Sequence, residues 1–415
     1  MAATIGTNGN LPAGWRCVKL GEVCKLQTGG TPSKSDAANF DGDIKWLVSG
    51  DVHQGEIFDC AGRITKQGMA NSNASLLPPD CVLIALNGQG KTRGTVALLR
   101  VEATCNQSLV AIIPKEQGSL LSHFLLYQLR MRYQELRNLT GDSHRSGLSM
   151  GILGNLAIRL APVSEQKRIV RILREQMAMV DKARESAQAR LEAIMTLPAS
   201  FLRQVFPQPD QPLPSDWHLA SLDDLCNGRG QYGTSTKSND DMKGTPILGM
   251  YHIHNGQIRW ENVSHVELPR TELSKYLLNR GDLLFNRTNS AELVGKTAVY
   301  DREAEAVFAS YLIRFRFAKD TADPHFVCAY INSRSGRAFI ERKMGRAIGQ
   351  VNISASTMGK MPIPIPHIAE QRRIVAVLHE QLAAAEQARI AAEEELRTIN
   401  ILPTAMLGRA FSGEI

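Results

Sequence analysis

One stretch of the chain carries residues that could bind a nucleotide. Ala85, Gly90, Lys91 and Thr92 fit the relaxed phosphate-binding loop pattern. Such a loop binds phosphate only where it opens a helix, because the helix dipole and the free amides then converge on the anion. Here Thr92 is followed by the strand-like sequence Arg-Gly-Thr-Val. We therefore expect a turn between two strands, and no ATP site in this chain.

Patterns for other catalytic or metal chemistry are weak. The chain has no Asn-Pro-Pro-aromatic or Asp-Pro-Pro-aromatic motif of an amino-methyltransferase and no His-Glu-x-x-His motif. His252 and His254 could face one side of a strand as metal ligands, but no third ligand lies near them in the sequence. The seven cysteines form no Cys-x-x-Cys pair, which argues against a zinc site and a disulfide framework. We expect no catalytic residue, no metal site and no cofactor in this chain.

Basic and amide side chains instead have the chemistry for contacting nucleic acid. The net charge is +7, and arginines cluster on two predicted helical stretches, 122–139 and 324–344. Arginine and lysine suit phosphate, while arginine reads guanine and asparagine or glutamine reads adenine. The candidate DNA-binding residues lie on these helices and on glycine-rich loops. They are Lys91, Arg93, Arg130, Arg132, Ser143, His144, Arg145, Asn286, Arg287, Asn289, Arg342, Lys343, Arg346, Gln350 and Asn352.

The sequence contains an internal repeat, in which one unit occurs twice. The sequence Leu-Pro-x-x-Trp occurs at residues 11–15 and again at 213–217, an offset of 202 residues. The sequence Glu-Gln-x-Arg-Ile-Val occurs at 165–170 and again at 370–375, an offset of 205 residues. A repeat of this period indicates two copies of one structural unit. The predicted order is globular domain, long helix, globular domain, long helix.

Each long helix is predicted from a seam of apolar or small residues at alternating steps of four and three. So narrow a stripe favours pairing of the two helices over packing on a globular core. We expect an antiparallel coiled coil and a pseudo-twofold internal repeat; the alternative is two exposed helices that never meet. Pro198 and Pro403 are expected to end or kink the helices. The expected pairing residues are Ile169, Leu173, Val180, Ala183, Ala187, Ile194, Ile374, Leu378, Ala385, Ala388, Ala392 and Ile399.

The globular segments show short, strand-rich periodicity. Buried strands are predicted at 81–86 and 282–285, at matching places in the repeat, and likewise at 96–99 and 312–315. The fold class is α+β, with two strand-rich domains separated by a pair of long antiparallel helices. The expected divisions are a tail at 1–10, a first domain at 11–162, a helical spacer at 163–206, a proline-rich linker at 207–212, a second domain at 213–367 and a helical spacer at 368–411.

Composition fits a folded, intracellular protein of two domains. The chain has 415 residues, about twice what one core usually organises, with 43% hydrophobic and 21% charged residues. No apolar stretch approaches the ~20 residues needed to cross a bilayer, and the first ten residues lack a signal-peptide pattern. We expect no membrane contact and a cytoplasmic location.

The duplicated pattern resembles the DNA-specificity (S) subunit of type I restriction–modification systems, over essentially the whole chain. The resemblance rests on the two Glu-Gln-x-Arg-Ile-Val segments, each preceded by Pro162 or Pro366. It also rests on motifs inside the domains. These are Gly29-Gly30-Thr31-Pro32-Ser33, Ala103-Thr104-Cys105-Asn106-Gln107-Ser108, Leu278-x-x-Gly281-Asp282-Leu283-Leu284, Gly295-Lys296-Thr297 and Gln350-Val351-Asn352-Ile353.

The resemblance implies two target-recognition domains, each reading one half of an interrupted, asymmetric site in double-stranded DNA. It implies that the helices set the spacer and dock two methyltransferase (M) subunits, which carry S-adenosylmethionine. Restriction (R) subunits driven by ATP and Mg²⁺ join the larger assembly. It places no catalytic residue in this chain. Two alternatives stay open: a self-contained methyltransferase or nuclease, and a helical protein scaffold without sequence-specific DNA binding.

Overall fold

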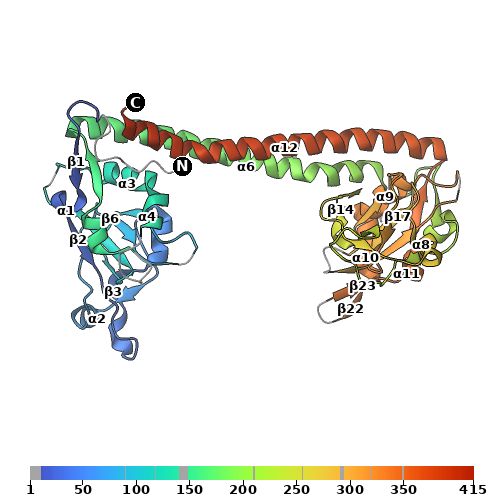
Figure 1. Ribbon diagram of the computed structural model, residues 1–415, viewed down its shortest axis with the longest axis horizontal. Coiled ribbons are helices and arrows are strands. Elements are labelled where there is room, and N and C mark those ends of the chain that lie inside the picture. The colour runs from blue at the N-terminus through green and yellow to red at the C-terminus, as the bar shows by residue number, and fades with distance from the viewer. Residues whose placement is uncertain are drawn as a thin grey trace. The chain divides into compact units, whose positions relative to one another are not determined.

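The computed structural model describes residues 11–88, 90–116, 118–139, 148–208, 211–254, 256–289, 294–318, 320–347 and 350–415. The chain divides into two compact units. Unit 1 comprises Met1–Ala187 and Glu395–Ile415, and unit 2 comprises Gln188–Glu394. Two long helices, α6 (Val163–Val205) and α12 (Ile368–Ser412), each contribute to both units (Figure 1). Each unit is described by itself.

The strand-rich part of unit 1 is built on a sheet with the strand order β2-β9-β6-β7-β4, beside a smaller sheet β5-β3-β8 and the pair β1-β10. Its strands are β1 (Arg16–Lys19), β2 (Cys24–Thr28), β3 (Phe40–Leu47), β4 (Glu56–Ile57), β5 (Arg63–Ile64), β6 (Val82–Ala85), β7 (Val96–Leu99), β8 (Thr104–Cys105), β9 (Leu109–Pro114) and β10 (Ala157–Leu160). Its short helices are α1 (Leu20–Val23), α2 (Lys66–Ala70), α3 (Ser122–Met131), α4 (Tyr133–Asn138) and α5 (Met150–Gly154), with 3-10 turns η1 (Ala37–Asn39) and η2 (Ser49–Gln54).

The main sheet of unit 1 separates two hydrophobic cores, because side chains alternate between its faces. On β6, Val82 and Ile84 belong to the core that includes α3 and the first turns of α6. Leu83 and Ala85 belong to the core on the other face, beneath β3 and β8. Strands β6, β7 and the first four residues of β9 are buried on both faces, which explains why their sequences read as continuous apolar runs.

Unit 2 repeats this plan, with the sheet β12-β21-β17-β19 at its centre and smaller sheets β16-β13-β20, β18-β23-β22, β14-β15 and β11-β24. Its strands are β11 (His218–Ser221), β12 (Gln231–Tyr232), β13 (Thr245–Leu248), β14 (Ile253–His254), β15 (Gln257–Ile258), β16 (His265–Val266), β17 (Leu283–Asn286), β18 (Thr288–Asn289), β19 (Thr297–Val299), β20 (Val307–Phe308), β21 (Leu312–Phe315), β22 (Gly345–Ala347), β23 (Gln350–Asn352) and β24 (Pro362–Ile365). Its helices are α7 (Leu222–Leu225), α8 (Arg270–Tyr276), α9 (Pro324–Asn332), α10 (Arg334–Lys343) and α11 (Ala355–Gly359), with the 3-10 turn η3 (Met250–His252).

Strand pairing identifies which elements of the two units are equivalent. Strand β6 lies between β9 and β7, and β17 lies in the same way between β21 and β19. The expected match between 96–99 and 312–315 was therefore wrong. The counterpart of 96–99 is β19, and the counterpart of β21 is β9. Both segments are short apolar runs, so composition alone did not distinguish their places in the sheet.

Two predicted helical stretches are each divided in two. Helix α3 ends before Arg132, and α4 begins after it. In unit 2, Ser333 has an extended backbone (ψ 166°) between α9 and α10, and its side chain accepts a hydrogen bond from the amide of Gly336. A serine that caps a helix in this way begins a new helix. The single helices expected at 122–139 and 324–344 are therefore corrected to two helix pairs.

A buried glutamine begins each long helix and ties it to its domain. The Gln166 side chain accepts a hydrogen bond from the Leu121 amide (2.8 Å) and donates one to the Ala161 carbonyl (2.9 Å). In unit 2 the Gln371 side chain accepts a hydrogen bond from the Asp323 amide (2.8 Å). Leu121 and Asp323 directly precede α3 and α9, so each glutamine links two helix starts. This bonding explains why the glutamine recurs in both copies of the motif.

The glutamate and arginine of the same motif pair with each other on the helix surface. Arg168 donates two hydrogen bonds to Glu165 (2.7 and 2.8 Å), and Arg373 donates two to Glu370 (2.6 and 2.7 Å). The hydrogen bonds from Arg168 lower the pKa of Glu165 below its usual range. The repeated Glu-Gln-x-Arg sequence is therefore a structural signature of the helix start in both units.

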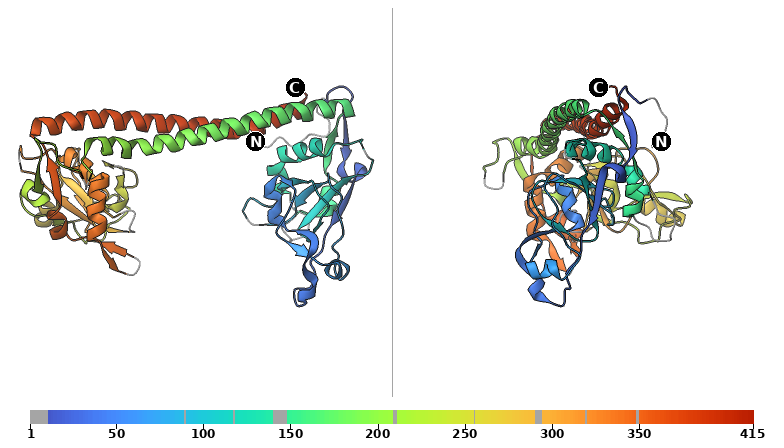
Figure 2. Two further views of the ribbon diagram at one scale, coloured as in Figure 1. Left: turned by 180° about the vertical axis from the view of Figure 1, so that it is seen from behind. Right: turned by 90° about the vertical axis from the view of Figure 1, so that its left-hand side faces the viewer.

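In unit 1 the start of α6 lies beside the end of α12, as both views show (Figures 1 and 2). Ile169 and Leu173 of α6 share a core with Leu407 and Phe411 of α12. Further along, Val180 and Ala187 of α6 cluster with Ile399 of α12. Arg184 donates a hydrogen bond from Nε to the Asn400 side chain (2.9 Å).

In unit 2 the last turns of α6 share a core with the first turns of α12. Phe201, Leu202 and Phe206 belong with Ile374 and Leu378 to the core beneath α9. The seam residues at the helix starts therefore pack on globular cores as well as on the partner helix, which corrects the expectation of pairing alone. Most expected pairing residues are buried. Those are Ile169, Leu173, Val180, Ala187, Ile374, Leu378, Ala385, Ala392 and Ile399.

Three expected pairing residues and two prolines differ from the prediction. Ile194 and Ala388 are half-buried, and Ala183 is exposed, so Ala183 is not part of the seam. Neither Pro198 nor Pro403 ends its helix, because α6 continues to Val205 and α12 to Ser412. A helix can pass through proline where the freed carbonyl finds another partner, such as water.

Candidate nucleic-acid interface

The loop that fits the phosphate-binding pattern is a turn between antiparallel strands. Gly94 donates a backbone hydrogen bond to the Ala85 carbonyl (2.9 Å), and β7 follows it directly. No helix opens at Thr92 in the described part of this loop, as expected. Lys91 is exposed on the turn and remains a predicted DNA contact.

Three arginines predicted in domain one have protein contacts. Arg93 is half-buried and donates hydrogen bonds to the carbonyls of Arg137 and Leu139, so it holds the end of α4 and stays a predicted DNA contact. Arg132 is corrected to a structural residue, because its side chain is 5% exposed, pairs with Glu135 and donates to the Ala157 carbonyl. Arg130 donates to the Gly55 carbonyl (3.3 Å) and lies at the surface.

A small sheet in unit 2 brings several predicted residues together. Strand β23 pairs with both β18 and β22, so Asn352 lies opposite Thr288 on one side and Gly345 on the other. Asn352 is exposed and accepts a hydrogen bond from the Thr288 hydroxyl (3.4 Å). The backbones of Asn289, Arg346 and Gln350 belong to the same sheet. The sheet therefore places four of the predicted contacts on neighbouring strands.

Two neighbouring residues differ in their access to a ligand. Asn286 is 1% exposed on β17, so it cannot reach a base and is corrected to a core residue. Arg287 stacks its guanidinium over the Tyr232 ring, 4.9 Å from the centroid. Its Nε is buried and has no hydrogen-bond partner among the described residues, and Tyr232 is 40% exposed. An arginine stacked on an exposed aromatic ring is a preorganised platform for a base or a phosphate.

The remaining predicted residues are exposed or undescribed. Arg342 and Lys343 are exposed in the last turn of α10, where cations stabilise the helix end and could also contact phosphate. Ser143, His144 and Arg145 lie outside the described residues, as do the side chains of Asn289, Arg346 and Gln350.

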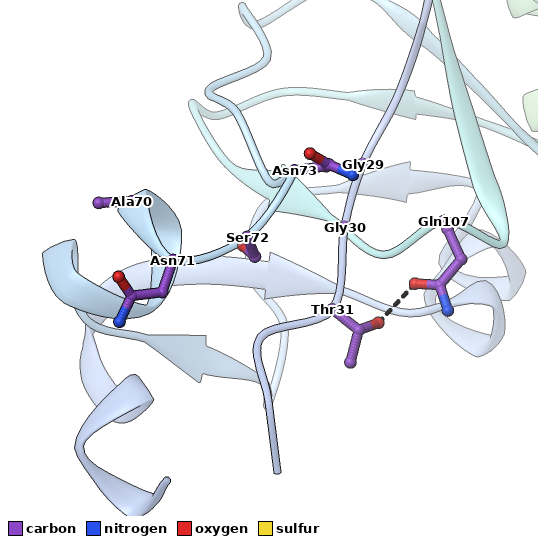
Figure 3. A pocket seen from close by; sticks show the side chains of 8 residues that line it. All are labelled: Gly29, Gly30, Thr31, Ala70, Asn71, Ser72, Asn73 and Gln107. Atoms are coloured by element: carbon purple, nitrogen blue, oxygen red, sulfur yellow. Dashed lines mark hydrogen bonds between the residues drawn. The ribbon is translucent and has the colours of Figure 1, made fainter. Parts of the chain in front are cut away.

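The sequence reasoning missed a polar surface hollow in unit 1 (Figure 3). It is lined by two segments that carried the family resemblance and by the turn that follows α2. The lining residues are Gly29, Gly30, Thr31, Ala70, Asn71, Ser72, Asn73 and Gln107. The presence of Thr31 and Gln107 in resemblance motifs was a usable signal. Asn71 and Asn73 had none, because nothing in the sequence places the turn after α2 beside Gly30.

Residues 147–151 also match Gly-x-Ser-x-Gly, the nucleophile pattern of many hydrolases. The Ser149 hydroxyl accepts a hydrogen bond from the Ile152 amide (3.3 Å) and caps α5. In the described residues it forms no hydrogen bond with a histidine, which a serine nucleophile requires. Ser149 is therefore a helix cap.

The two histidines considered as metal ligands have protein contacts as well. The Gly249 amide donates a hydrogen bond to His252 Nδ1 (2.8 Å), and His254 donates to the Tyr251 carbonyl (2.8 Å). Within the described ranges, no group of three or more potential ligand side chains could hold a metal ion. His252 therefore acts as an acceptor for the backbone at η3.

Acidification is expected to destabilise unit 2 through His252. Burial lowers its pKa below the ordinary value of 6.5, so the unfolded chain binds a proton at a pH where the folded chain does not. This contribution is complete above pH 6.5 and is lost as the pH falls through the lower folded pKa. We expect a loss of about 1 kcal/mol, seen as lower protection factors for the amides of β13 and β14 at acidic pH, after correction for the pH dependence of intrinsic exchange. An equal pH dependence in the His252→Gln variant would contradict this.

Comparison with known proteins identifies the family. Residues 12–187 and 214–394 each match the type I restriction modification DNA specificity domain. The chain belongs to this family. The specificity subunit of the type I restriction enzyme EcoKI from Escherichia coli K12 is 24% identical over 430 residues, covering 98% of this chain and 90% of that relative. The StySPI specificity subunit from Salmonella potsdam is 22% identical over 428 residues, with the same two coverages.

Solved structures show the same fold. The HsdS subunit from Thermoanaerobacter tengcongensis matches 98% of this chain and 99% of its own, with a TM-score of 0.64 and 21% identity. A chain from a study of complex assembly in a type I R-M system matches 98% of this chain and all of its own, with a TM-score of 0.77 and 21% identity. Among the described residues, no helix is long and apolar enough to span a membrane.

Proposed function

We propose that this chain is the sequence-specific DNA-binding subunit of a type I restriction–modification complex. Each globular domain reads one half of an interrupted site in double-stranded DNA. The observation that carries this proposal is the presence of two DNA specificity domains in one chain. The strand frameworks of the two domains are equivalent, whereas their surface residues differ. Two unlike readers favour an asymmetric site over a palindrome.

Helices α6 and α12 set the spacing between the half-sites as an antiparallel coiled coil in a pseudo-twofold molecule. Contacts in both units support this arrangement. Phe411 at the end of α12 enters the core of unit 1, and Phe206 at the end of α6 enters the core of unit 2. Helix α6 has 43 residues, or roughly 65 Å at about 1.5 Å per residue, enough for more than one ~34 Å turn of DNA.

The chain acts without catalytic residues of its own, and methyltransferase subunits dock on its helices. Exposed apolar side chains on α6 and α12 are available for this docking. They include Met179, Met195, Val377, Ile390 and Ile401. S-adenosylmethionine would be bound by two methyltransferase subunits, and ATP with Mg²⁺ by restriction subunits. The complex would act on DNA in the cytoplasm.

The test is co-expression with the methyltransferase subunit of the same restriction–modification system, followed by methylation mapping of host DNA. We expect one split, asymmetric motif. Exchange of residues 213–367 for those of a relative should change one half of the motif and leave the other half unchanged. Insertion of a whole number of helical turns in both α6 and α12 should change the spacer but not the half-site bases.

Absence of any sequence-selective methylation or DNA binding, with the partner subunits present and assembled, would instead support a helical protein scaffold. Methylation by the chain alone would support a self-contained enzyme.

A further inference from the structure

The hollow in unit 1 lies on a framework that recurs in unit 2. The Gly30 amide donates a hydrogen bond to the Cys105 carbonyl (3.0 Å), and the Thr234 amide donates one to the Phe308 carbonyl (2.9 Å). In both units the residue before the donor amide must be glycine, because the two backbone segments lie so close together. A Cβ at Gly29 would lie 1.7 Å from the Cys105 oxygen, and a Cβ at Gly233 would lie 2.1 Å from the Phe308 oxygen. The backbone geometry at this place is therefore shared by the two units.

The side chains on this framework are not shared. In unit 1 the Ser108 carbonyl, in the loop after β8, accepts a hydrogen bond from the Leu86 amide (2.9 Å). In unit 2 the Tyr311 carbonyl accepts the corresponding hydrogen bond from the Arg287 amide (3.0 Å). Ser108 and Tyr311 are thus equivalent, so the position of Gln107 is occupied by serine in unit 2. Two domains that recognise different DNA sequences need the same backbone scaffold with different side chains at the binding surface.

The amide of Gln107 is held in one orientation at the rim of the hollow. The Thr31 hydroxyl donates a hydrogen bond to Gln107 Oε1 (2.5 Å), as Figure 3 shows. Gln107 is exposed, and its Nε2 forms no hydrogen bond within the described ranges. Because an amide oxygen has two lone pairs, Oε1 can still accept a second hydrogen bond. One donor and one acceptor therefore face outwards together.

Asparagines extend this polar surface across the hollow. Asn73 is exposed, and its side chain forms no hydrogen bond to another described residue. Asn71 is also exposed and has one weak bond, from Nδ2 to Asn39 Oδ1 (3.4 Å). An amide that donates and accepts side by side matches the N7 and N6 edge of adenine.

We propose that this hollow is the base-reading surface of domain one, in which Gln107 and Asn73 contact adenine edges and Thr31 positions Gln107. The inference rests on the proposed function and names the residues that would carry it out. The remaining contacts of domain one, including Lys91, hold the phosphate backbone.

The experiment measures recognition by the full chain assembled with its methyltransferase. Complexes carrying Gln107→Ala or Asn73→Ala are tested against duplexes in which each base pair of the methylated motif is changed singly. Each substitution should reduce discrimination at one position of one half-site by about tenfold to hundredfold. The other half-site should be read as before. Gln134→Ala, which removes an exposed amide on α4 outside the hollow, is the matched control and should leave discrimination unchanged.

Thr31 has a test of its own. Thr31→Val removes the hydroxyl and should relax the same base position as Gln107→Ala, whereas Thr31→Ser keeps the hydroxyl and should restore discrimination. A merely structural role would affect assembly or overall affinity without selecting that position.

The outcomes separate this inference from the proposed function. Unchanged discrimination in both alanine variants would overturn the hollow as the reading surface, while a split motif in the wild type would leave the proposed function intact. Absence of any motif in the wild type would remove both. If a variant no longer methylates, direct binding to the same duplexes gives the discrimination. Uniform weakening across all duplexes would also count against base reading.

Discussion

Replacement of Phe411 by alanine will loosen unit 1 and leave unit 2 unchanged. Phe411 is fully buried, and its ring lies 5.1 Å from that of Phe124, edge to face. The Trp15 ring also packs against Phe124, at 5.9 Å between centroids. Large-to-small changes at such sites cost about 3–5 kcal/mol, since apolar contact is lost and a cavity remains. The loss falls on unit 1 because the core there includes the end of α12.

The mirror experiment uses Phe206 in unit 2. Phe206 is 5.3 Å from Phe326, and Trp217 packs on Phe326 at 5.7 Å. Phe206→Ala should therefore loosen unit 2 by a similar amount. Amide exchange reads the two units separately: β6 reports on unit 1 and β17 on unit 2. Phe58→Ala is the control, because Phe58 is 61% exposed and its removal should change neither unit. Equal loss in both units from either substitution would contradict the assignment.

The sequence repeat marks these two packing residues, although their contacts were not predicted from it. Phe206 and Phe411 stand at the same offset as the Glu-Gln-x-Arg motifs, and they occupy the same place in their units. Both phenylalanines repeat across the duplication, and both units use them for packing. The buried glutamines Gln166 and Gln371 show the same rule, since each satisfies backbone groups at a helix start.

The arginine clusters show why surface function was harder to predict. Arg130, Arg132 and Arg137 are close in sequence, but Arg132 turns inwards to Glu135 and to the Ala157 carbonyl. That choice depends on a partner 25 residues away, which no local pattern reveals. The hollow is a similar case, because the backbone of Asn73 lies beside Gly30 only in the folded chain, 43 residues away in the sequence. Motifs indicated where the framework lies, whereas the side chains that face a ligand were set by tertiary packing.

The two units also differ inside their cores, at one position that carries a charge in unit 2 and none in unit 1. The Tyr300 amide bonds to the Asp282 carbonyl, and the Leu99 amide bonds to the Cys81 carbonyl, so Asp282 and Cys81 are equivalent. Unit 2 thus places a carboxylate where unit 1 has a buried thiol. Burial raises the pKa of Cys81 to about 12, so that position carries no charge in unit 1.

Asp282 is expected to be indispensable although its counterpart is apolar. Its side chain is 2% exposed, accepts two hydrogen bonds from Arg316 (2.7 and 2.8 Å) and lies 3.8 Å from Arg314, which is also buried. It also accepts a hydrogen bond from the Asn279 amide (2.9 Å). The hydrogen bonds that Arg316 donates to Asp282 hold the pKa of Arg316 above its usual value. Asp282→Ala would therefore leave a buried arginine unpaired and destabilise unit 2 by about 3–5 kcal/mol.

Two comparisons test this charge argument. Asp301→Ala removes an exposed carboxylate that pairs with His325, and such surface pairs contribute about 0–1 kcal/mol. Strand pairing makes Ala111 and Ile113 the counterparts of Arg314 and Arg316. The triple variant D282C/R314A/R316I, which copies unit 1, should lose less stability than Asp282→Ala, because no charge remains buried alone. Amide exchange at β17 and β21 measures all three. A triple variant as unstable as the single one would show that Asp282 acts through shape and not through charge.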